Sequence, residues 1–272
     1  MPDIHSKFFS ASASHRWMGK KGSDGCAASV LLPQREEGNT AAADEGTMGH
    51  FFTEQTLRLR VAAMREGADP LQHNVADFLG QKHATWRLAE NHIVDLQGYV
   101  NFVWALVQAG GRLYIETQVD YSQPLGVDHL EGILRAFGTS DAVVIMPNGT
   151  AWIIDLKFGH WEVDAEINTQ MMCYALGVYR RLRLVHSIVR FRLVIYQPRT
   201  KGRPDDQWAF TFDQMAVFVK AARLGADRIM EALEFLNTTG KVPPQYYRPT
   251  VDNCQFCKVE ECGARKKSWG RR

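Results

Sequence analysis

The 272-residue chain has no uninterrupted apolar run of about 18 residues, the length from which a membrane-spanning helix is predicted. Residues 1–17, MPDIHSKFFSASASHRW, also lack the continuous apolar stretch of a secretory signal peptide. No internal repeat and no long low-complexity segment is present. We therefore expect a cytoplasmic protein without a membrane partner, in which the five cysteines are reduced rather than joined in disulfides.

A large excess of charge of one sign is also missing. The net charge is +2, so the overall charge gives no argument for binding to nucleic acid. The last eight residues, RKKSWGRR, nevertheless contain five Arg or Lys and no acid, and such a tail either contacts phosphate or is simply solvated. With 45% hydrophobic and 23% charged residues, the chain has the composition of a globular protein with a sizeable core.

Hydrophobic periodicity predicts helices on either side of a group of strands. Helices are expected over 45–66 (with Thr47 as N-cap), within 71–110, over 164–183 and over 213–237, and strands over 112–122, 141–146, 151–158, 187–198 and 207–212. This order predicts an α/β domain with a mixed central sheet flanked by helices. We expect an irregular segment at 1–40, a core at 41–240 with a helical segment at 68–110, and an irregular, cysteine-containing end at 241–272.

Two charged residues interrupt the apolar sequence IIDLK at 153–157. Asp155 and Lys157 are two residues apart, so they project from the same face of a strand. A two-residue turn before this strand would need an N–H from Pro147, which has none. We therefore predict a three-residue loop over 147–149, in which Gly149 takes the left-handed conformation.

This loop places Asp141 directly opposite Asp155, with Cβ atoms roughly 5 Å apart. Two carboxylates this close repel each other and favour a cation between them, and carboxylate oxygens with waters are the usual ligands of Mg²⁺. The alternative is a surface ion pair between Asp155 and Lys157 on a solvated sheet face. The opposed Asp141 favours the metal site.

Three of the five cysteines have the spacing C-x2-C-x4-C, at Cys254, Cys257 and Cys262. In a reducing compartment such spacing indicates a metal site, and Cys26 is the natural fourth ligand. Four thiolates suit either an iron–sulfur cluster or structural Zn²⁺, and the spacing does not distinguish them. Cys173 is predicted to be a small core residue.

The ordered motifs Gly138-x-x-Asp141, Asp155-x-Lys157 and Gln170-x-x-x-Tyr174 resemble those of the PD-(D/E)XK nuclease superfamily. The RecB-like branch is the most similar, since its members carry a histidine on an early helix, here His50 in EGTMGH. The segments SASASHRW, GTSDAVVI and QMMCYALG resemble a phage- and prophage-borne family of such nucleases. The second acid is Asp rather than Glu, as in many RecB-like members.

The resemblance implies a metal-dependent DNA nuclease, in particular an exonuclease, in a bacterial host cell. Asp141 and Asp155 would bind Mg²⁺ or Mn²⁺ with help from the Leu156 carbonyl. His50 would add a nitrogen ligand, which favours Mn²⁺. Lys157 would orient the attacking water and stabilise charge on the phosphate.

The remaining site residues have alternatives. Gln170 and Tyr174 share a helix face and would contact the DNA backbone or steady Lys157, although Tyr174 is equally suited to the core. Glu116 is the candidate for a further metal-binding acid. Its rivals are Asp120 and Glu54.

Several RecB-like nucleases hold a 4Fe–4S cluster with one cysteine before the core and three after it. This resemblance favours iron–sulfur over Zn²⁺ for Cys26 and the C-terminal cysteines. DNA is the expected partner, together with a single-strand annealing protein or a helicase, and Trp269 with the basic tail could hold single-stranded DNA. The alternative function is a DNA-end-binding module without cleavage.

Overall fold

A five-stranded mixed sheet forms the centre of the protein. The computed structural model describes residues 6–19, 24–35 and 40–265. The sheet has the order β3-β4-β5-β6-β7, in which β5 and β6 are parallel and the other neighbours antiparallel. Its strands are β3 (Arg112–Asp120), β4 (Phe137–Ile145), β5 (Thr150–Leu156), β6 (Arg190–Tyr196) and β7 (Asp205–Phe210).

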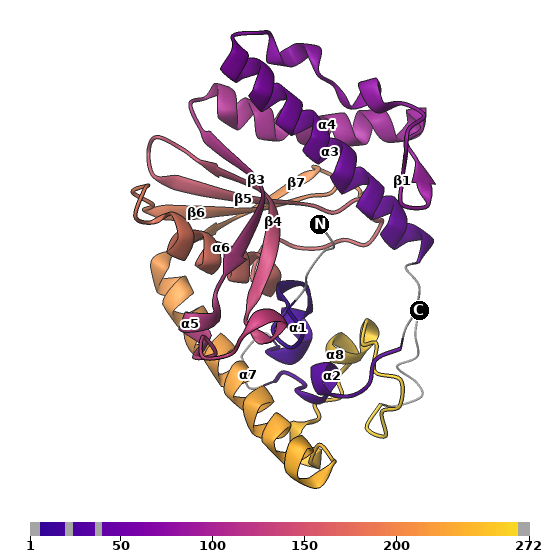
Figure 1. The fold of residues 1–272 in the computed structure, drawn as a ribbon, viewed down its shortest axis with the longest axis vertical. Helices are drawn as coiled ribbons and strands as arrows, with labels where there is room; N and C mark the ends of the chain where they lie inside the picture. Colours follow the sequence, from indigo (N-terminus) through magenta and orange to yellow (C-terminus); the bar gives the residue numbers. More distant parts are fainter. Residues whose placement is uncertain (1–5, 20–23, 36–39, 266–272) are drawn as a thin grey trace.

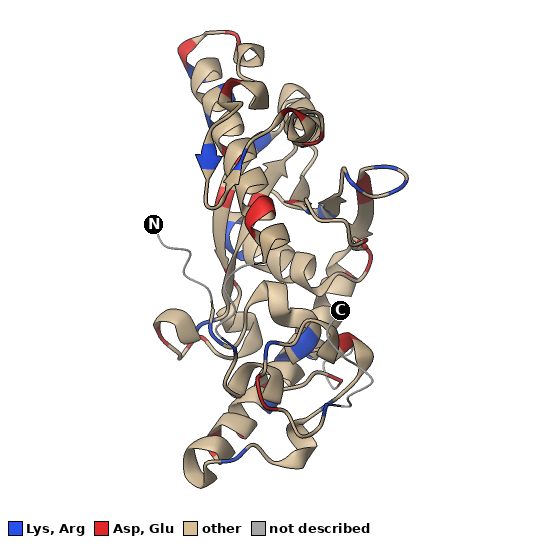
Figure 2. Ribbon diagram, turned by 90° about the vertical axis from the view of Figure 1, so that its right-hand side faces the viewer, with Lys and Arg blue, Asp and Glu red and all other residues tan. Residues whose placement is uncertain are grey.

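Helices cover both faces of this sheet (Figure 1). One face packs against α3 (Ala41–Glu66) and α4 (Glu90–Gln108), and the other against α6 (Thr169–Leu182) and α7 (Phe212–Thr239). Alternation along β5 sends Ile153 to the α6 side and Ile154 to the α3 side. The predicted α/β class, with a mixed sheet flanked by helices, is confirmed. Lys, Arg, Asp and Glu are interspersed along the molecule (Figure 2), in agreement with the small net charge.

The hairpin between β4 and β5 has the predicted register. Ile145 pairs with Ala151 and Val143 with Ile153. The Gly149 N–H donates to the Met146 carbonyl at 2.9 Å, and Gly149 has a φ of 77°. The β4–β5 ladder ends at the pair Ala142 and Ile154. Asp141 and Asp155 therefore occupy the next position, where the two strands separate.

The turn can be tested by replacing Gly149 with alanine. A Cβ at this position would lie 2.5 Å from the Ser187 carbonyl oxygen, on a backbone with positive φ. We expect Gly149→Ala to lower the free energy of unfolding by at least about 2 kcal/mol, measured by urea denaturation. Gly46→Ala is the matched control, because nothing lies within 4 Å of its new Cβ. It should raise the stability by about 0.5–1 kcal/mol, as glycine is a poor helix former. A Gly149→Ala protein as stable as wild type would contradict this account of the turn.

The N-terminal segment is not irregular as predicted. It forms a 3₁₀ turn η1 (Ala11–Ala13) and the short helices α1 (Ser14–Trp17) and α2 (Ala28–Leu31). Phe9, Trp17 and Met18 are buried against the α6 and α7 side of the sheet. The prediction of an irregular segment followed from its many Ser, Gly and Ala residues. It did not take account of the three large apolar side chains, whose burial stabilises the short helices.

The segment 71–110 is α-helical only from Glu90 onward. Before α4 the chain forms η2 (Pro70–Gln72), η3 (Val75–Phe78) and a small hairpin of β1 (Lys82–His83) and β2 (Trp86–Arg87). Asn74 and Asp77 cap the start of η3, which favours a short turn over a continuous helix.

Some helices begin at residues other than those predicted. Thr40 rather than Thr47 caps α3, and the Thr47 hydroxyl donates to the Ala43 carbonyl inside the helix. Asn168 caps α6, so this helix begins later than predicted. The C-terminal segment contains short helical turns within the predicted irregular region. The remaining elements are α5 (Ser122–Leu125), η4 (Gly132–Leu134), η5 (Pro244–Tyr246) and α8 (Val251–Gln255).

Candidate metal centres

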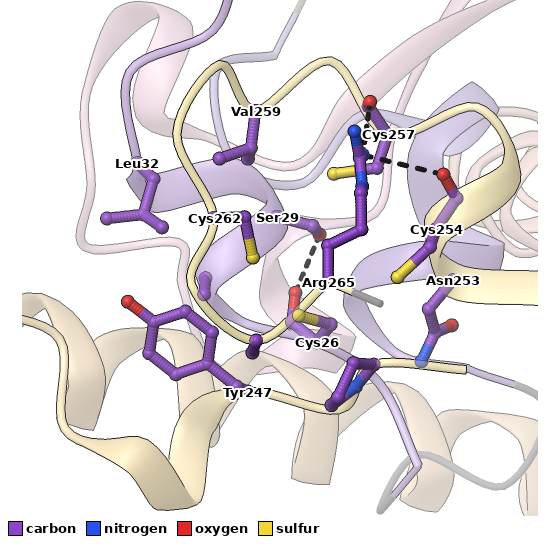
Figure 3. Close-up of a pocket in the computed structure, with 13 residues that line it drawn as sticks. Cys26, Ser29, Leu32, Tyr247, Asn253, Cys254, Cys257, Val259, Cys262 and Arg265 are labelled. Carbon is purple, nitrogen blue, oxygen red and sulfur yellow. Dashed lines mark hydrogen bonds between the residues drawn. The ribbon is translucent and has the colours of Figure 1, made fainter. Parts of the chain in front are cut away.

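The cysteines near the two ends of the chain line one pocket (Figure 3). Cys26 precedes α2, Cys254 lies in α8, and Cys257 and Cys262 follow α8. The helices α1, α2 and α8 lie side by side below the sheet (Figure 1), and Gln34 forms a β-bridge with Val259. Segments 26–34 and 253–265 are thus held together at this pocket.

Four thiol groups from two separate segments of the chain line this pocket, and thiolates are common metal ligands. Cys26 and Cys254 are buried, whereas Cys257 and Cys262 are partly exposed. Burial, together with the other cysteines, raises the thiol pKa of both Cys26 and Cys254. A metal would lower the free energy of their thiolate forms. The residues present therefore fit a thiolate-bound metal group.

A second candidate centre lies where β4 and β5 separate. Glu116 on β3 is opposite Asp141 on β4, between the pairs Ile115–Ala142 and Thr117–Ser140. Glu116 has a φ of 46°, which interrupts the ladder at this position. Ligand atoms of Glu116, Asp141 and His50 all lie within 4.8 Å of one another. Of the described residues, which include the four pocket cysteines, no other group of three potential ligands is this compact.

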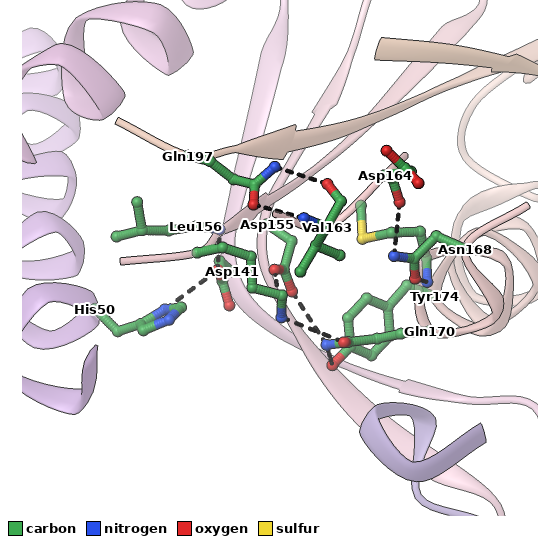
Figure 4. Close-up of polar contacts among 12 residues, drawn as sticks. His50, Asp141, Asp155, Leu156, Val163, Asp164, Asn168, Gln170, Tyr174 and Gln197 are labelled. Atoms are coloured by element: carbon green, nitrogen blue, oxygen red, sulfur yellow. Dashed lines mark hydrogen bonds and ion pairs between the residues drawn. The ribbon is translucent and has the colours of Figure 1, made fainter. Parts of the chain in front are cut away.

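His50 reaches Asp141 from α3 (Figure 4). Its Nδ1 lies 3.2 Å from Asp141 Oδ2, which also accepts a 2.7 Å hydrogen bond from the Leu156 N–H. Burial alone would lower the pKa of His50, but the Asp141 carboxylate raises it to about 9. Burial conversely favours the neutral form of Asp141, but His50 and the Leu156 N–H lower its pKa. Asp141 is therefore an ionised acid suited to a cation.

Asp155 instead faces Gln170 (Figure 4) and forms an ion pair with Lys157. The Asp155 side chain is 3% exposed, and its Oδ2 lies 2.7 Å from Lys157 Nζ. Gln170 Nε2 donates to Asp155 Oδ1 at 3.1 Å, and Lys157 Nζ donates to Gln170 Oε1 at 3.2 Å. Burial alone would lower the pKa of Lys157, but Asp155 raises it. Lys157 is therefore held as a cation beside the group of Glu116, Asp141 and His50.

A family model described as "Protein of unknown function (DUF2800)" matches residues 5–269. The chain belongs to the DUF2800 family. The matched region includes both candidate centres of this DUF2800 protein.

In this DUF2800 protein, the Tyr174 ring occupies the space that a side chain at position 138 would need. A Cβ on Gly138 would lie 2.8 Å from Tyr174 Cε1, so this position needs glycine for the tyrosine to fit. The Tyr174 ring is buried in the core, and its hydroxyl accepts from Gln170 Nε2 at 3.0 Å. Tyr174 is therefore a core residue, and its hydroxyl also contacts the Gln170 amide that binds Lys157.

The rival acids have other partners. Glu54 pairs with Arg58 at 2.7 Å, and Asp120 pairs with Arg135 at 2.6 Å. Glu116 is the candidate that lies with His50 and Asp141. Cys173 is fully buried in α6, as predicted for a core residue. The basic tail and Trp269 lie outside the described residues, apart from Arg265.

Sequence reasoning missed Tyr99, which lies on the apolar stripe of α4. Its hydroxyl is buried and has no hydrogen-bond partner among the described residues. Burial raises the phenol pKa well above its usual value, and the charges of Asp141, Glu116 and Asp155 raise it further. Tyr99 thus keeps its proton beside the acidic group. A tyrosine on a stripe of apolar residues gives no sequence signal that separates this position from plain core.

Proposed function

We propose that this protein is a divalent-metal-dependent DNA nuclease of the PD-(D/E)XK superfamily, most similar to its RecB-like branch. The observation that carries the proposal is the compact group of His50, Glu116 and Asp141 beside the cation of Lys157. A group of acids and an imidazole suits Mg²⁺ or Mn²⁺, and a fixed lysine next to it suits a phosphate substrate.

The residues would share the chemistry of phosphodiester hydrolysis as follows. Asp141, Glu116 and His50 would hold the cation, with Asp155 and the Leu156 carbonyl as the further ligands that the resemblance implies. When bound, such a cation supplies positive charge at the scissile phosphate and lowers the pKa of the attacking water. Lys157 Nζ would donate to a phosphate oxygen and orient the water.

Asp155 and Gln170 would control the charge and the position of Lys157. Asp155 keeps the ammonium protonated, and Gln170 fixes its direction through a second hydrogen bond. Tyr174 in turn orients the Gln170 amide. This chain of contacts presents one positive charge to the substrate without the freedom of a surface lysine.

The four-cysteine pocket would hold a 4Fe–4S cluster, or alternatively Zn²⁺. Around one tetrahedral zinc, with Zn–S distances of about 2.3 Å, the sulfur atoms are about 4 Å apart. No three of the four sulfurs, all in described residues, lie within 4.8 Å of one another, so the preference for the cluster rests on the resemblance alone. The pocket would clasp the chain ends beside the nuclease core.

We further propose that the enzyme acts in the cytoplasm of a bacterial host, from a phage or prophage gene, on DNA ends in recombination, repair or degradation. A single-strand annealing protein or a helicase would be its partner. In the described ranges, no helix is both long and apolar enough to cross a membrane.

The direct test is an assay of purified protein on linear, end-blocked and circular DNA with Mg²⁺ or Mn²⁺. An exonuclease degrades free-ended linear DNA and loses activity with chelator or blocked ends. Cleavage of circular DNA would identify an endonuclease. Binding of DNA ends without cleavage under either metal would contradict the proposal and favour the non-cleaving module.

A further inference from the structure

We propose that Arg16 and Arg265 balance the charge of the four-cysteine site and donate N–H groups to its sulfur atoms. The inference rests on the proposed metal site and adds a second layer of residues to it. Its basis is two guanidinium groups that lie against the cysteines with buried, unpartnered N–H groups.

Arg16 approaches the cysteines from α1. Its Nη1 donates to the Phe256 carbonyl at 2.9 Å, and its own carbonyl accepts from the Cys26 N–H at 2.7 Å. The guanidinium also contacts the Cys257 thiol. The Arg16 Nε is buried and has no hydrogen-bond partner among the described residues. Arg16 is thus fixed between two of the four cysteines, with one donor unused.

Arg265 enters from the C-terminal side and extends between the cysteine side chains (Figure 3). Its Nη2 donates to the Cys257 carbonyl at 2.8 Å, and its guanidinium contacts the Cys254 thiol. The Arg265 Nε, like that of Arg16, is buried without a partner in the described part of the chain. Each of the two arginines therefore contacts a cysteine thiol and keeps a buried Nε that has no hydrogen-bond partner in the described part of the chain.

The charges explain why arginines belong there. Four thiolates around a zinc ion, or around a 4Fe–4S core of charge 2+, carry a net charge of −2. Leaving that charge uncompensated in a largely apolar pocket is costly. Two guanidinium groups supply +2, stay protonated and offer several N–H donors in a fixed plane. In the described residues, neither arginine pairs with a carboxylate that would already use its charge.

The test compares metal retention in Arg16→Gln, Arg265→Gln and the double variant. Wild-type and variant apoproteins are loaded with Zn²⁺, and the affinity is measured by competition with a chromogenic chelator. Loss of a residue that contacts metal ligands usually lowers the affinity about 10–100-fold, and we expect this range for each single variant and a larger loss for the double.

Two further variants separate charge from packing. Arg223→Gln is the matched control, because the Arg223 guanidinium on α7 binds the Pro124 carbonyl and does not line the cysteine pocket. It should keep wild-type affinity. Arg265→Lys retains the positive charge and should recover a large part of the affinity lost in Arg265→Gln. If the protein purifies with iron, the glutamine variants should also have a lower reduction potential than wild type.

The outcomes are distinct. Wild-type affinity in the double variant, or equal losses in Arg223→Gln and Arg265→Gln, would overturn the charge-balancing role and leave the cysteine site standing. A wild-type protein that takes up neither zinc nor iron would overturn the cysteine site and this inference together. Neither result bears on DNA cleavage by the acidic centre.

Discussion

Replacing Asp155 with asparagine is expected to lower the rate of DNA cleavage by about a thousandfold or more, while the protein stays folded. Asp155 is nearly inaccessible to solvent and holds Lys157 Nζ at 2.7 Å. The asparagine keeps the shape but removes the charge that raises the pKa of Lys157. Burial then disfavours the ammonium form, so the cation that faces the phosphate is lost or displaced.

The matched control is Asp120→Asn on β3, which lies two strands from β5 in the sheet. Asp120 has a partly exposed side chain and pairs with Arg135, a surface ion pair of small energetic value. Its variant should cleave linear DNA at a rate close to that of wild type. Both variants are compared by single-turnover cleavage with Mg²⁺ and with Mn²⁺, and their folding is checked by thermal unfolding.

A separate measurement of DNA binding makes the result specific. If Asp155 acts on the chemistry, Asp155→Asn should still bind DNA ends while cleavage is lost. Cleavage by Asp155→Asn at the wild-type rate would remove the proposed site. A protein that binds DNA equally well with and without Asp155, and that never cleaves, would instead match the end-binding alternative.

Local chemistry explains which parts of this site could be predicted from the sequence. Pro147 cannot donate an N–H, and Gly149 tolerates positive φ, so the turn and its register follow from residues adjacent in the chain. The register brings Asp141 and Asp155 to the position where the strands separate. Strand alternation then places Lys157 beside them.

Long-range packing decides what the sequence could not predict. His50 and Glu116 are candidates only through the family resemblance, because their grouping depends on how α3 crosses the sheet and no local pattern specifies that crossing. Glu116 also has a left-handed backbone that a strand pattern does not anticipate. The N-terminal helices form because Phe9 and Trp17 find an apolar surface on α6 and α7, far along the chain. Arg16 lies beside Cys257 for the same reason.

The second large effect concerns the four-cysteine pocket, whose cysteines should behave differently from Cys173, the fifth cysteine of the chain. Cys26→Ala is expected to remove most of the bound metal and to destabilise the protein strongly, since structural metal sites contribute on the order of 10 kcal/mol of binding free energy. Cys26 lines the pocket from the N-terminal side. Its loss would weaken the contact between the α1–α2 segment and α8.

Cys173→Ala supplies the matched control. Cys173 is fully buried in α6, and burial raises its thiol pKa so that it stays protonated and unsuited to bind metal. Its removal leaves a small cavity, which should cost about 1–2 kcal/mol without loss of metal. Cys26→Ala therefore removes a sulfur atom from the four-cysteine pocket, whereas Cys173→Ala removes one from the core.

Metal analysis of anaerobically purified protein, thermal unfolding and limited proteolysis would measure this difference. Wild type and Cys173→Ala should carry equal amounts of iron or zinc and resist cleavage within 241–265. Cys26→Ala should be depleted of metal and cut in that segment, because its contacts with residues 24–35 depend on the pocket. Equal metal content in all three proteins would show that Cys26 is not a ligand. Iron with sulfide in the first two would select the cluster, whereas zinc alone would select the single ion and require the four sulfurs to move closer together.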